Sequence, residues 1–253
     1  MSRPVKPFAA NKDRTMADVA LQPQLYVALD FADPGLVNPF VERLNPGECG
    51  LKVGKELFTR GGPDLVRRLV RQGFPVFLDL KFHDIPHTVE QACKAACDLG
   101  VRLVNVHAMG GRAMMAAARR AVSQSPDSPA LIAVTVLTSM DQSALAEVGI
   151  TRPLAEQVSM LASLAQEEGL DGVVCSAWEA NTMRRIFTQP MPAIVTPGIR
   201  PAGAALDDQS RVMTPSEAIM AGATSIVVGR PITRATQPAE VVSDILTSMT
   251  ARV

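Results

Sequence analysis

Short apolar runs alternate with amphipathic helical segments along most of this chain, beginning near Leu25. Each run is nearly continuous in Val, Ile, Leu and Ala, a pattern typical of parallel strands that are covered on both faces. The runs predicted as strands are 25–30, 50–54, 75–81, 103–108, 130–137, 172–177, 193–199 and 225–230. Eight strand–helix units in 253 residues predict a single-domain α/β fold, the (β/α)8 TIM barrel.

Helices are expected between these strands. The clearest candidates repeat apolar residues at a helical spacing, and they are 63–72, 154–168 and 239–249. Thr88 and Gln91 stand three residues apart after Pro86, which suggests a capping box at the start of another helix. A doubly wound sheet is the alternative architecture, but no Gly-x-Gly-x-x-Gly follows the first predicted strand.

The chain offers no linker rich enough in Pro, Gly or Ser to divide it, so we expect residues 21–253 to form one barrel. Residues 1–20 are polar and mixed in charge, which predicts a loosely ordered tail and not a secretion signal. No apolar run approaches the about 20 residues that a membrane span needs. We therefore expect a cytoplasmic protein that does not bind membranes.

Composition excludes further classes. Lys and Arg together number 25, as do Asp and Glu, and no basic run stands out, so the chain lacks the charge pattern of a nucleic-acid-binding protein. The four cysteines contain no Cys-x-x-Cys pair, so buried free thiols are expected in place of a structural zinc site.

The segment Asp79-Leu80-Lys81-Phe82-His83-Asp84 concentrates charge where a buried strand should end. Residues two apart on a strand point to the same side, so Asp79 and Lys81 should share a face, with Asp84 within reach of the same ammonium. Flanking carboxylates favour the charged lysine, which can then donate a proton or stabilise a carbanion. The alternative is a plain salt bridge at a strand end.

Other polar residues occupy the predicted carboxyl ends of the strands, where active sites of such barrels lie. They include Asp30, Lys52, His107, Thr138 and Ser176. Because so many polar side chains fall at the same end of otherwise apolar strands, we expect them to line a common cup.

The last two strand ends suggest a phosphate site, because the loops after strands seven and eight of such barrels often bind phosphate. Arg200 and Arg230 supply forked donors, and Gly229 lets backbone amides approach an anion closely. Gln209 lies on the long segment 197–212 and is placed to close over the site. A turn with surface salt bridges is the alternative, but the two arginines together favour phosphate.

The histidines give a weaker signal. His83, Asp84 and His107 could be imagined as metal ligands at strand ends. His83 and His87 flank Ile85-Pro86, however, which need not direct them together, so hydrogen-bonded imidazoles near the cup are the favoured interpretation.

Six motifs in order resemble one family, the orotidine 5′-phosphate decarboxylases, from about Leu25 to the last helix. The match is to the bacterial branch that carries Lys-Phe-His-Asp-Ile-Pro. The motifs are Val-Ala-Leu-Asp, Leu-Lys-Val-Gly-Lys-Glu, Asp-Leu-Lys-Phe-His-Asp-Ile-Pro-x-Thr, Val-Thr-Val-Leu-Thr-Ser, Val-Thr-Pro-Gly-Ile-Arg and Val-Gly-Arg-Pro-Ile-Thr.

The resemblance implies decarboxylation of orotidine 5′-monophosphate to UMP in de novo pyrimidine biosynthesis, with no metal and no organic cofactor. It implies that Lys81 protonates C6 of the pyrimidine, that Asp79 lies against the substrate carboxylate, and that Lys52 and Asp84 complete a network of alternating charge. The resemblance also implies that Asp84 and Thr88 are lent to the neighbouring subunit's site, and hence a homodimer with shared active sites. The other implied substrate contacts are Asp30, Lys52, Thr138, Arg200, Gln209, Gly229 and Arg230.

Two alternatives remain open at this point. A metal-dependent sugar-phosphate lyase, synthase or epimerase of the same barrel type would reuse Asp-x-Lys-x-x-Asp, and chelation would abolish its activity. A catalytically silent nucleotide-binding barrel would bind UMP and leave orotidine 5′-monophosphate unchanged. The intact set of Asp79, Lys81 and Asp84 argues against the silent barrel.

Overall fold

The computed structural model of the chain describes residues 24–125, 128–201 and 213–250. In these residues, eight parallel strands follow one another around a closed barrel, and the eighth strand pairs with the first. The predicted (β/α)8 fold is therefore confirmed, whereas the prediction for residues 1–20 lies outside the described part. The strands are β1 (Leu25–Ala28), β2 (Gly50–Gly54), β3 (Val76–Phe82), β4 (Leu103–His107), β5 (Ala130–Val134), β6 (Gly172–Val174), β7 (Ala193–Thr196) and β8 (Ser225–Val228).

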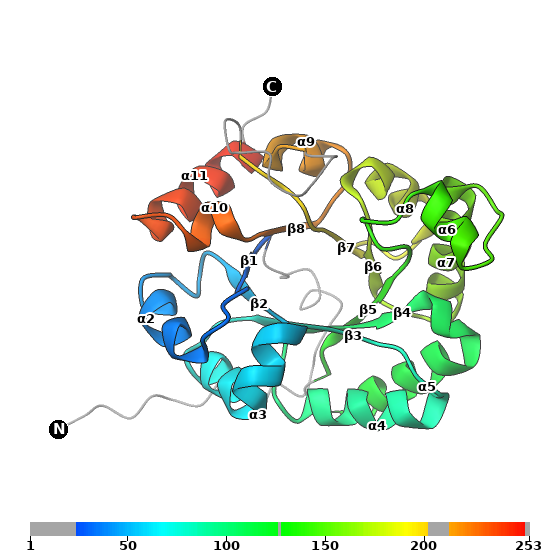
Figure 1. Cartoon of the computed structure of the whole chain (residues 1–253), viewed down its shortest axis with the longest axis horizontal. Coiled ribbons are helices and arrows are strands. Elements are labelled where there is room, and N and C mark those ends of the chain that lie inside the picture. Colours follow the sequence, from blue (N-terminus) through cyan, green and yellow to red (C-terminus); the bar gives the residue numbers. More distant parts are fainter. Residues whose placement is uncertain (1–23, 126–127, 202–212, 251–253) are drawn as a thin grey trace.

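The helices surround this ring of strands (Figure 1). Three short 3₁₀ turns, η1 (Pro34–Leu36), η2 (Ala108–Gly110) and η3 (Ala177–Glu179), lead into α2, α5 and α8. The α-helices of the described chain are α2 (Val37–Val41), α3 (Lys55–Arg71), α4 (Pro86–Cys97), α5 (Gly111–Ser123), α6 (Gln142–Glu147), α7 (Leu154–Glu167), α8 (Ala180–Ile186), α9 (Pro215–Met220), α10 (Arg230–Thr233) and α11 (Pro238–Thr250). None of these helices has the length and the apolar character that crossing a membrane requires.

Helix boundaries correct two sequence-based predictions. The segment predicted as 63–72 is the second part of α3, which begins at Lys55 and kinks at Gly62, where φ is 65°. Glycine accommodates this angle without the Cβ clash of other residues, so the helix continues past the kink. The capping box expected at Thr88 is wrong, because α4 already begins at Pro86 and its N-cap, Ile85, makes no side-chain hydrogen bond.

The core has two apolar layers, because side chains alternate between the inside and the outside of the barrel along each strand. The larger layer lies between strands and helices, and all four cysteines are buried free thiols. The smaller layer fills the barrel, where the rings of Tyr26 and Phe77 meet edge to face with centroids 5.7 Å apart. Asp79 follows Phe77 by two residues on β3 and points to the same inward side, as does Asn105 on the neighbouring strand β4. The barrel interior therefore changes from apolar to polar toward its mouth.

Most strands end two or more residues before their predicted ends. β1 stops at Ala28, β5 at Val134 and β6 at Val174, so Asp30 and Thr138 lie on the loops that follow these strands. The loop positions place polar side chains at the carboxyl end of the barrel, where the backbone is free to turn toward a ligand.

Candidate active site

Four charged side chains form a row across one side of the barrel mouth. The Lys52 Nζ atom lies 3.4 Å from Asp30 Oδ1 and 3.4 Å from Asp79 Oδ2. The Lys81 Nζ atom lies 2.5 Å from Asp79 Oδ1. Carboxylate and ammonium thus alternate along residues that three consecutive strands, β1 to β3, present to the same opening.

Burial makes this alternation necessary. The side chains of Asp79 and Lys52 are only 12% and 11% exposed, whereas that of Asp30 is 65% exposed. A buried ion without a partner would destabilise the fold strongly, so Asp79 is tolerated because both of its oxygens face an ammonium. The row is therefore a fixed electrostatic arrangement that opens to solvent at Asp30.

The backbone at Lys81 departs from a regular strand. Leu78 pairs with Val104, but the next pair joins Phe82 to Val106, so four steps along β3 match two along β4. Lys81 has a φ of 53°, and among the described residues it alone, apart from glycines, has a positive φ. Such a conformation costs a residue with a side chain about 1–2 kcal/mol. Asp79 and Lys81 therefore meet through a bulge, and simple strand alternation does not explain their contact.

Asn105 supports this bulge from β4, and the sequence-based prediction missed it. Its Nδ2 donates to Asp79 Oδ1 at 2.7 Å, and its Oδ1 accepts the Lys81 backbone N–H at 2.8 Å. The available signal was a single amide within the otherwise apolar run 103–106, at the height of Asp79 on the neighbouring strand.

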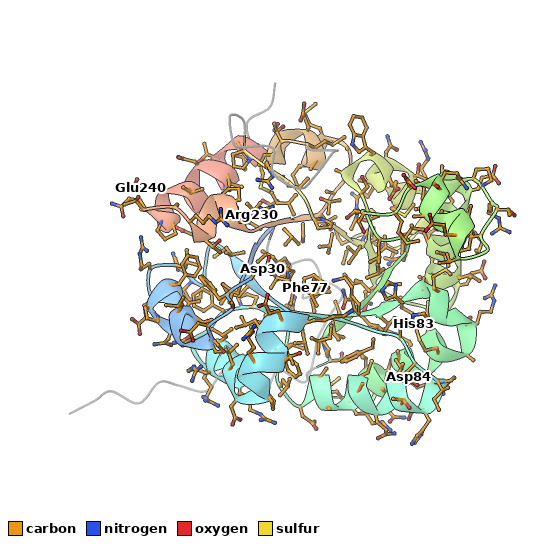
Figure 2. All side chains as sticks on the ribbon, in the orientation of Figure 1. Asp30, Phe77, His83, Asp84, Arg230 and Glu240 are labelled. Atoms are coloured by element: carbon orange, nitrogen blue, oxygen red, sulfur yellow. The ribbon has the colours of Figure 1, made fainter. Side chains whose placement is uncertain are left out.

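Asp84 does not join the row within one chain. Its carboxylate accepts the backbone N–H of Ile85 at 2.6 Å, and no ion pair within 4.0 Å links it to Lys81. Figure 2 shows Asp84 at the outer rim of the ring near α4, whereas Asp30 lies near the middle. Thr88 is exposed on the first turn of α4. The expectation that Asp84 reaches the Lys81 ammonium of its own chain is thus wrong, because the chain turns outward after β3.

A cavity of about 470 Å³ lies over the opposite side of the mouth, among the loops after β5 to β8. Thr138 and Arg230 line it, together with Ser176 and Gly198. The cavity adjoins the charged row at Gly229, which directly precedes Arg230 in the chain. A Cβ added to Gly229 would lie 3.6 Å from Asp30 Oδ2.

Arginines stand at the ends of the last two strands. Arg230 opens α10 beside the cavity, and Figure 2 shows it on the same side of the ring as α11. Arg200 is buried, and its backbone N–H donates to the carbonyl of Met213 at 3.1 Å, next to the bridge between Ile199 and Met213. Gln209 lies outside the described residues.

Trp178 lies in η3, in the segment that follows β6. It is 63% exposed and lines the cavity. Because it is the only tryptophan of the chain, its fluorescence reports on this cavity alone.

His107 sits near the charged row as a half-buried imidazole. Its ring centroid is 5.5 Å from that of His83. Burial chiefly, together with the nearby charges of His83 and Lys55, lowers the pKa of His107 to about 4. Across residues 24–125, 128–201 and 213–250, no three His, Cys, Asp or Glu side chains gather closely enough to hold a metal ion.

Known proteins resemble this chain over most of its length. The model of the orotidine 5′-phosphate decarboxylase / HUMPS family matches residues 23–245. An orotidine 5′-phosphate decarboxylase of Chromobacterium violaceum is 58% identical and one of Nitrosococcus oceani is 56% identical, the matches covering 91% and 85% of this chain and 91% and 92% of those proteins. The crystal structure of orotidine 5′-phosphate decarboxylase from Lactobacillus acidophilus superposes with a TM-score of 0.80 at 38% identity, covering 91% of this chain and 100% of that one.

The lowered pKa of His107 predicts a pH-dependent contribution to stability. Between pH 6.5 and about pH 4, the unfolded chain takes up a proton at this imidazole that the folded chain does not, so the free energy of unfolding falls as the pH drops. We expect His107→Gln to lose less thermal stability than the native chain over this window, in unfolding scans at a series of pH values. Exposed His87→Gln is the control. If the melting temperatures of His107→Gln and of the native chain fell equally as the pH dropped, the prediction would be contradicted.

Proposed function

This chain belongs to the orotidine 5′-phosphate decarboxylase / HUMPS family, and from that membership we propose that Lys81 is the acid of a decarboxylation at the barrel mouth. The family model spans two kinds of enzyme, but the highly identical relatives carry the decarboxylase name over at least 85% of this chain. The reaction is therefore conversion of orotidine 5′-monophosphate to UMP in pyrimidine biosynthesis. A cytoplasmic location stays a prediction.

The chemistry demands a fixed positive charge beside the pyrimidine ring. When the bond between C6 and the carboxylate carbon breaks, CO2 leaves and the electron pair stays on C6 in the plane of the ring, where the π system cannot delocalise it. An ammonium already held in place stabilises that pair without reorganising and then transfers a proton to C6. Lys81 leaves this step as a neutral amine and regains its proton from solvent.

The contact of 2.5 Å between Lys81 Nζ and Asp79 Oδ1 carries this proposal. Asp79 holds the Lys81 ammonium through Oδ1. Its other carboxylate oxygen, Oδ2, lies 3.4 Å from Lys52 Nζ. A substrate carboxylate placed next to Asp79 would be repelled, and the repulsion disappears as CO2 departs. Lys52 and Asp30, at the solvent end of the row, are assigned to the ribose.

Phosphate binding is assigned to the far side of the mouth. Arg230 lines the cavity that adjoins Asp30, and Arg200 and Gly229 belong to the same two strand ends. Thr138, which lines the same cavity, is assigned to a further substrate contact. Because the phosphate is remote from the breaking bond, its binding energy can hold the substrate in the reactive position.

Asp84 and Thr88 are assigned to the active site of a second subunit. Residues 83–88 are all exposed, and Asp84 makes no ion pair with the charged row of its own chain. In a homodimer this exposed stretch is available to the neighbouring mouth, where Asp84 would add a second carboxylate to Lys81.

A metal-dependent sugar-phosphate synthase is the alternative, since the family model includes enzymes other than the decarboxylases. Chelation separates the two. We expect the purified protein to convert orotidine 5′-monophosphate to UMP in the presence of EDTA, and loss of conversion on chelation would favour the alternative.

Lys81→Ala tests the assigned acid. We expect kcat to fall at least about 1,000-fold, because the developing carbanion loses both its stabilising charge and its proton source. UMP binding, followed by Trp178 fluorescence, should persist. Lys94→Ala, which removes a half-exposed lysine on α4 paired with Glu90, should keep native turnover. Substantial decarboxylation by Lys81→Ala would remove the central assignment.

Arg230→Ala tests the phosphate site. A charge-assisted hydrogen bond contributes about 1.5–3 kcal/mol, so KM for orotidine 5′-monophosphate should rise about ten-fold to one hundred-fold. Steady-state kinetics measure the change, and Arg234→Ala, four residues on and exposed, is the matched control. An unchanged KM would place the phosphate elsewhere.

Mixing two inactive variants tests the shared sites. In a heterodimer of Lys81→Ala and Asp84→Ala chains, one of the two sites holds both native residues, so activity should return on mixing. Mixing Lys81→Ala with Asp79→Ala leaves no intact site, because both residues belong to the same mouth, and it should restore nothing. Absence of recovery in the first mixture, with dimers present, would show that Asp84 does not serve a neighbouring site.

A further inference from the structure

We propose that Asn105 is a positioning residue, which holds Lys81 and Asp79 in their reactive arrangement through one side-chain amide. The proposal rests on the function assigned above and extends the site to a residue that contacts no substrate. Asn105 is 0% exposed, so a molecule bound at the mouth does not reach it. Its influence on the reaction must pass through the two charged residues that it holds.

The amide of Asn105 uses both of its ends on the charged row. Its Nδ2 donates to Asp79 Oδ1 at 2.7 Å, and the same oxygen accepts from Lys81 Nζ at 2.5 Å. Its Oδ1 accepts the backbone N–H of Lys81 at 2.8 Å. One side chain therefore fixes the carboxylate that anchors the ammonium and also the backbone that carries it.

The hydrogen bond from the Lys81 backbone N–H to Asn105 Oδ1 lies where the regular pairing of β3 with β4 is interrupted. The pairing of β3 with β4 skips from Leu78–Val104 to Phe82–Val106, so the residues between lack regular partners. Lys81 lies in this gap with a φ of 53°, a conformation that residues other than glycine rarely adopt. A strained backbone persists only where its surroundings hold it, and Asn105 supplies a hydrogen bond at that point.

An amide satisfies both contacts at neutral pH, because it carries both a donor and an acceptor. Leucine has a similar size but neither donates nor accepts, so the Lys81 N–H and the Asp79 carboxylate would both lose a bond. Aspartate could accept from the Lys81 N–H, but its charge would oppose Asp79 at hydrogen-bond distance. Protonated aspartate again has one donor and one acceptor, and it therefore reproduces the pattern of the amide.

Asn105→Leu provides the first test. We expect kcat for orotidine 5′-monophosphate to fall about ten-fold to one hundred-fold through misplacement of Lys81, with KM and the Trp178-monitored affinity for UMP near native values. A residue that only stabilised the fold would change the melting temperature and leave kcat per folded molecule intact. Native kcat in Asn105→Leu would overturn the proposal.

Asn105→Asp provides a second test that does not depend on how well the leucine variant folds. The ratio of its kcat to that of the native enzyme should rise as the pH is lowered from about pH 8 to about pH 5.5, because protonation of one carboxyl restores the donor. For Asn105→Leu, which has nothing to titrate, the same ratio should stay level. A level ratio for Asn105→Asp would overturn the proposal.

The native enzyme in the same assay distinguishes a failure of the assigned reaction from a failure of the role proposed for Asn105. If it forms no UMP, the assigned reaction fails, whatever the variants do. If it forms UMP and both variants match it at every pH, the reaction stands and the role of Asn105 fails.

Discussion

Asp79 is a carboxylate buried between two ammonium groups, and the rest of the site follows from the need to keep it paired. An ion in this position would destabilise the barrel if either partner left, because the lost pairing would not be replaced by water. Lys52 from β2 and Lys81 from the end of β3 therefore have fixed places, and the amide of Asn105 completes the shell around the same carboxylate. In the proposed mechanism, the positive charge would be in place before any ligand arrives, so the chemical step would require no reorganisation.

The barrel mouth has two halves, one formed by the charged row and the other by the cavity. The charged row comes from the ends of β1 to β3, whereas the cavity lies among the loops after β5 to β8. Gly229 and Asp30 lie at the point where the halves meet. A ligand that spans both halves can use contacts in the second half to hold its reactive carbon against the first. In the proposed assignment, this arrangement keeps the phosphate away from Asp79, whose charge would repel an anion.

Much of this organisation was predictable from the sequence, and the remainder depends on geometry that spacing does not encode. Continuous apolar runs identify strands covered on both faces, and polar residues at their ends identify the mouth. The contact of Asp79 with Lys81 was expected, but its route through a bulge was not, because strand periodicity assumes a regular ladder. Asn105 was missed since a lone amide in a strand has many explanations. Asp84 was placed beside Lys81 by proximity in sequence, whereas the outward turn of the chain separates them.

The left-handed backbone of Lys81 sets activity and foldability against each other at one position. A residue in this conformation raises the energy of the native state, and glycine would relieve that penalty. Glycine would, however, also leave Asp79 without one of its two ammonium partners, so relief of the backbone strain and pairing of the buried carboxylate oppose each other here. A more thermostable descendant would have to gain stability elsewhere in the barrel and keep the strained backbone conformation of Lys81.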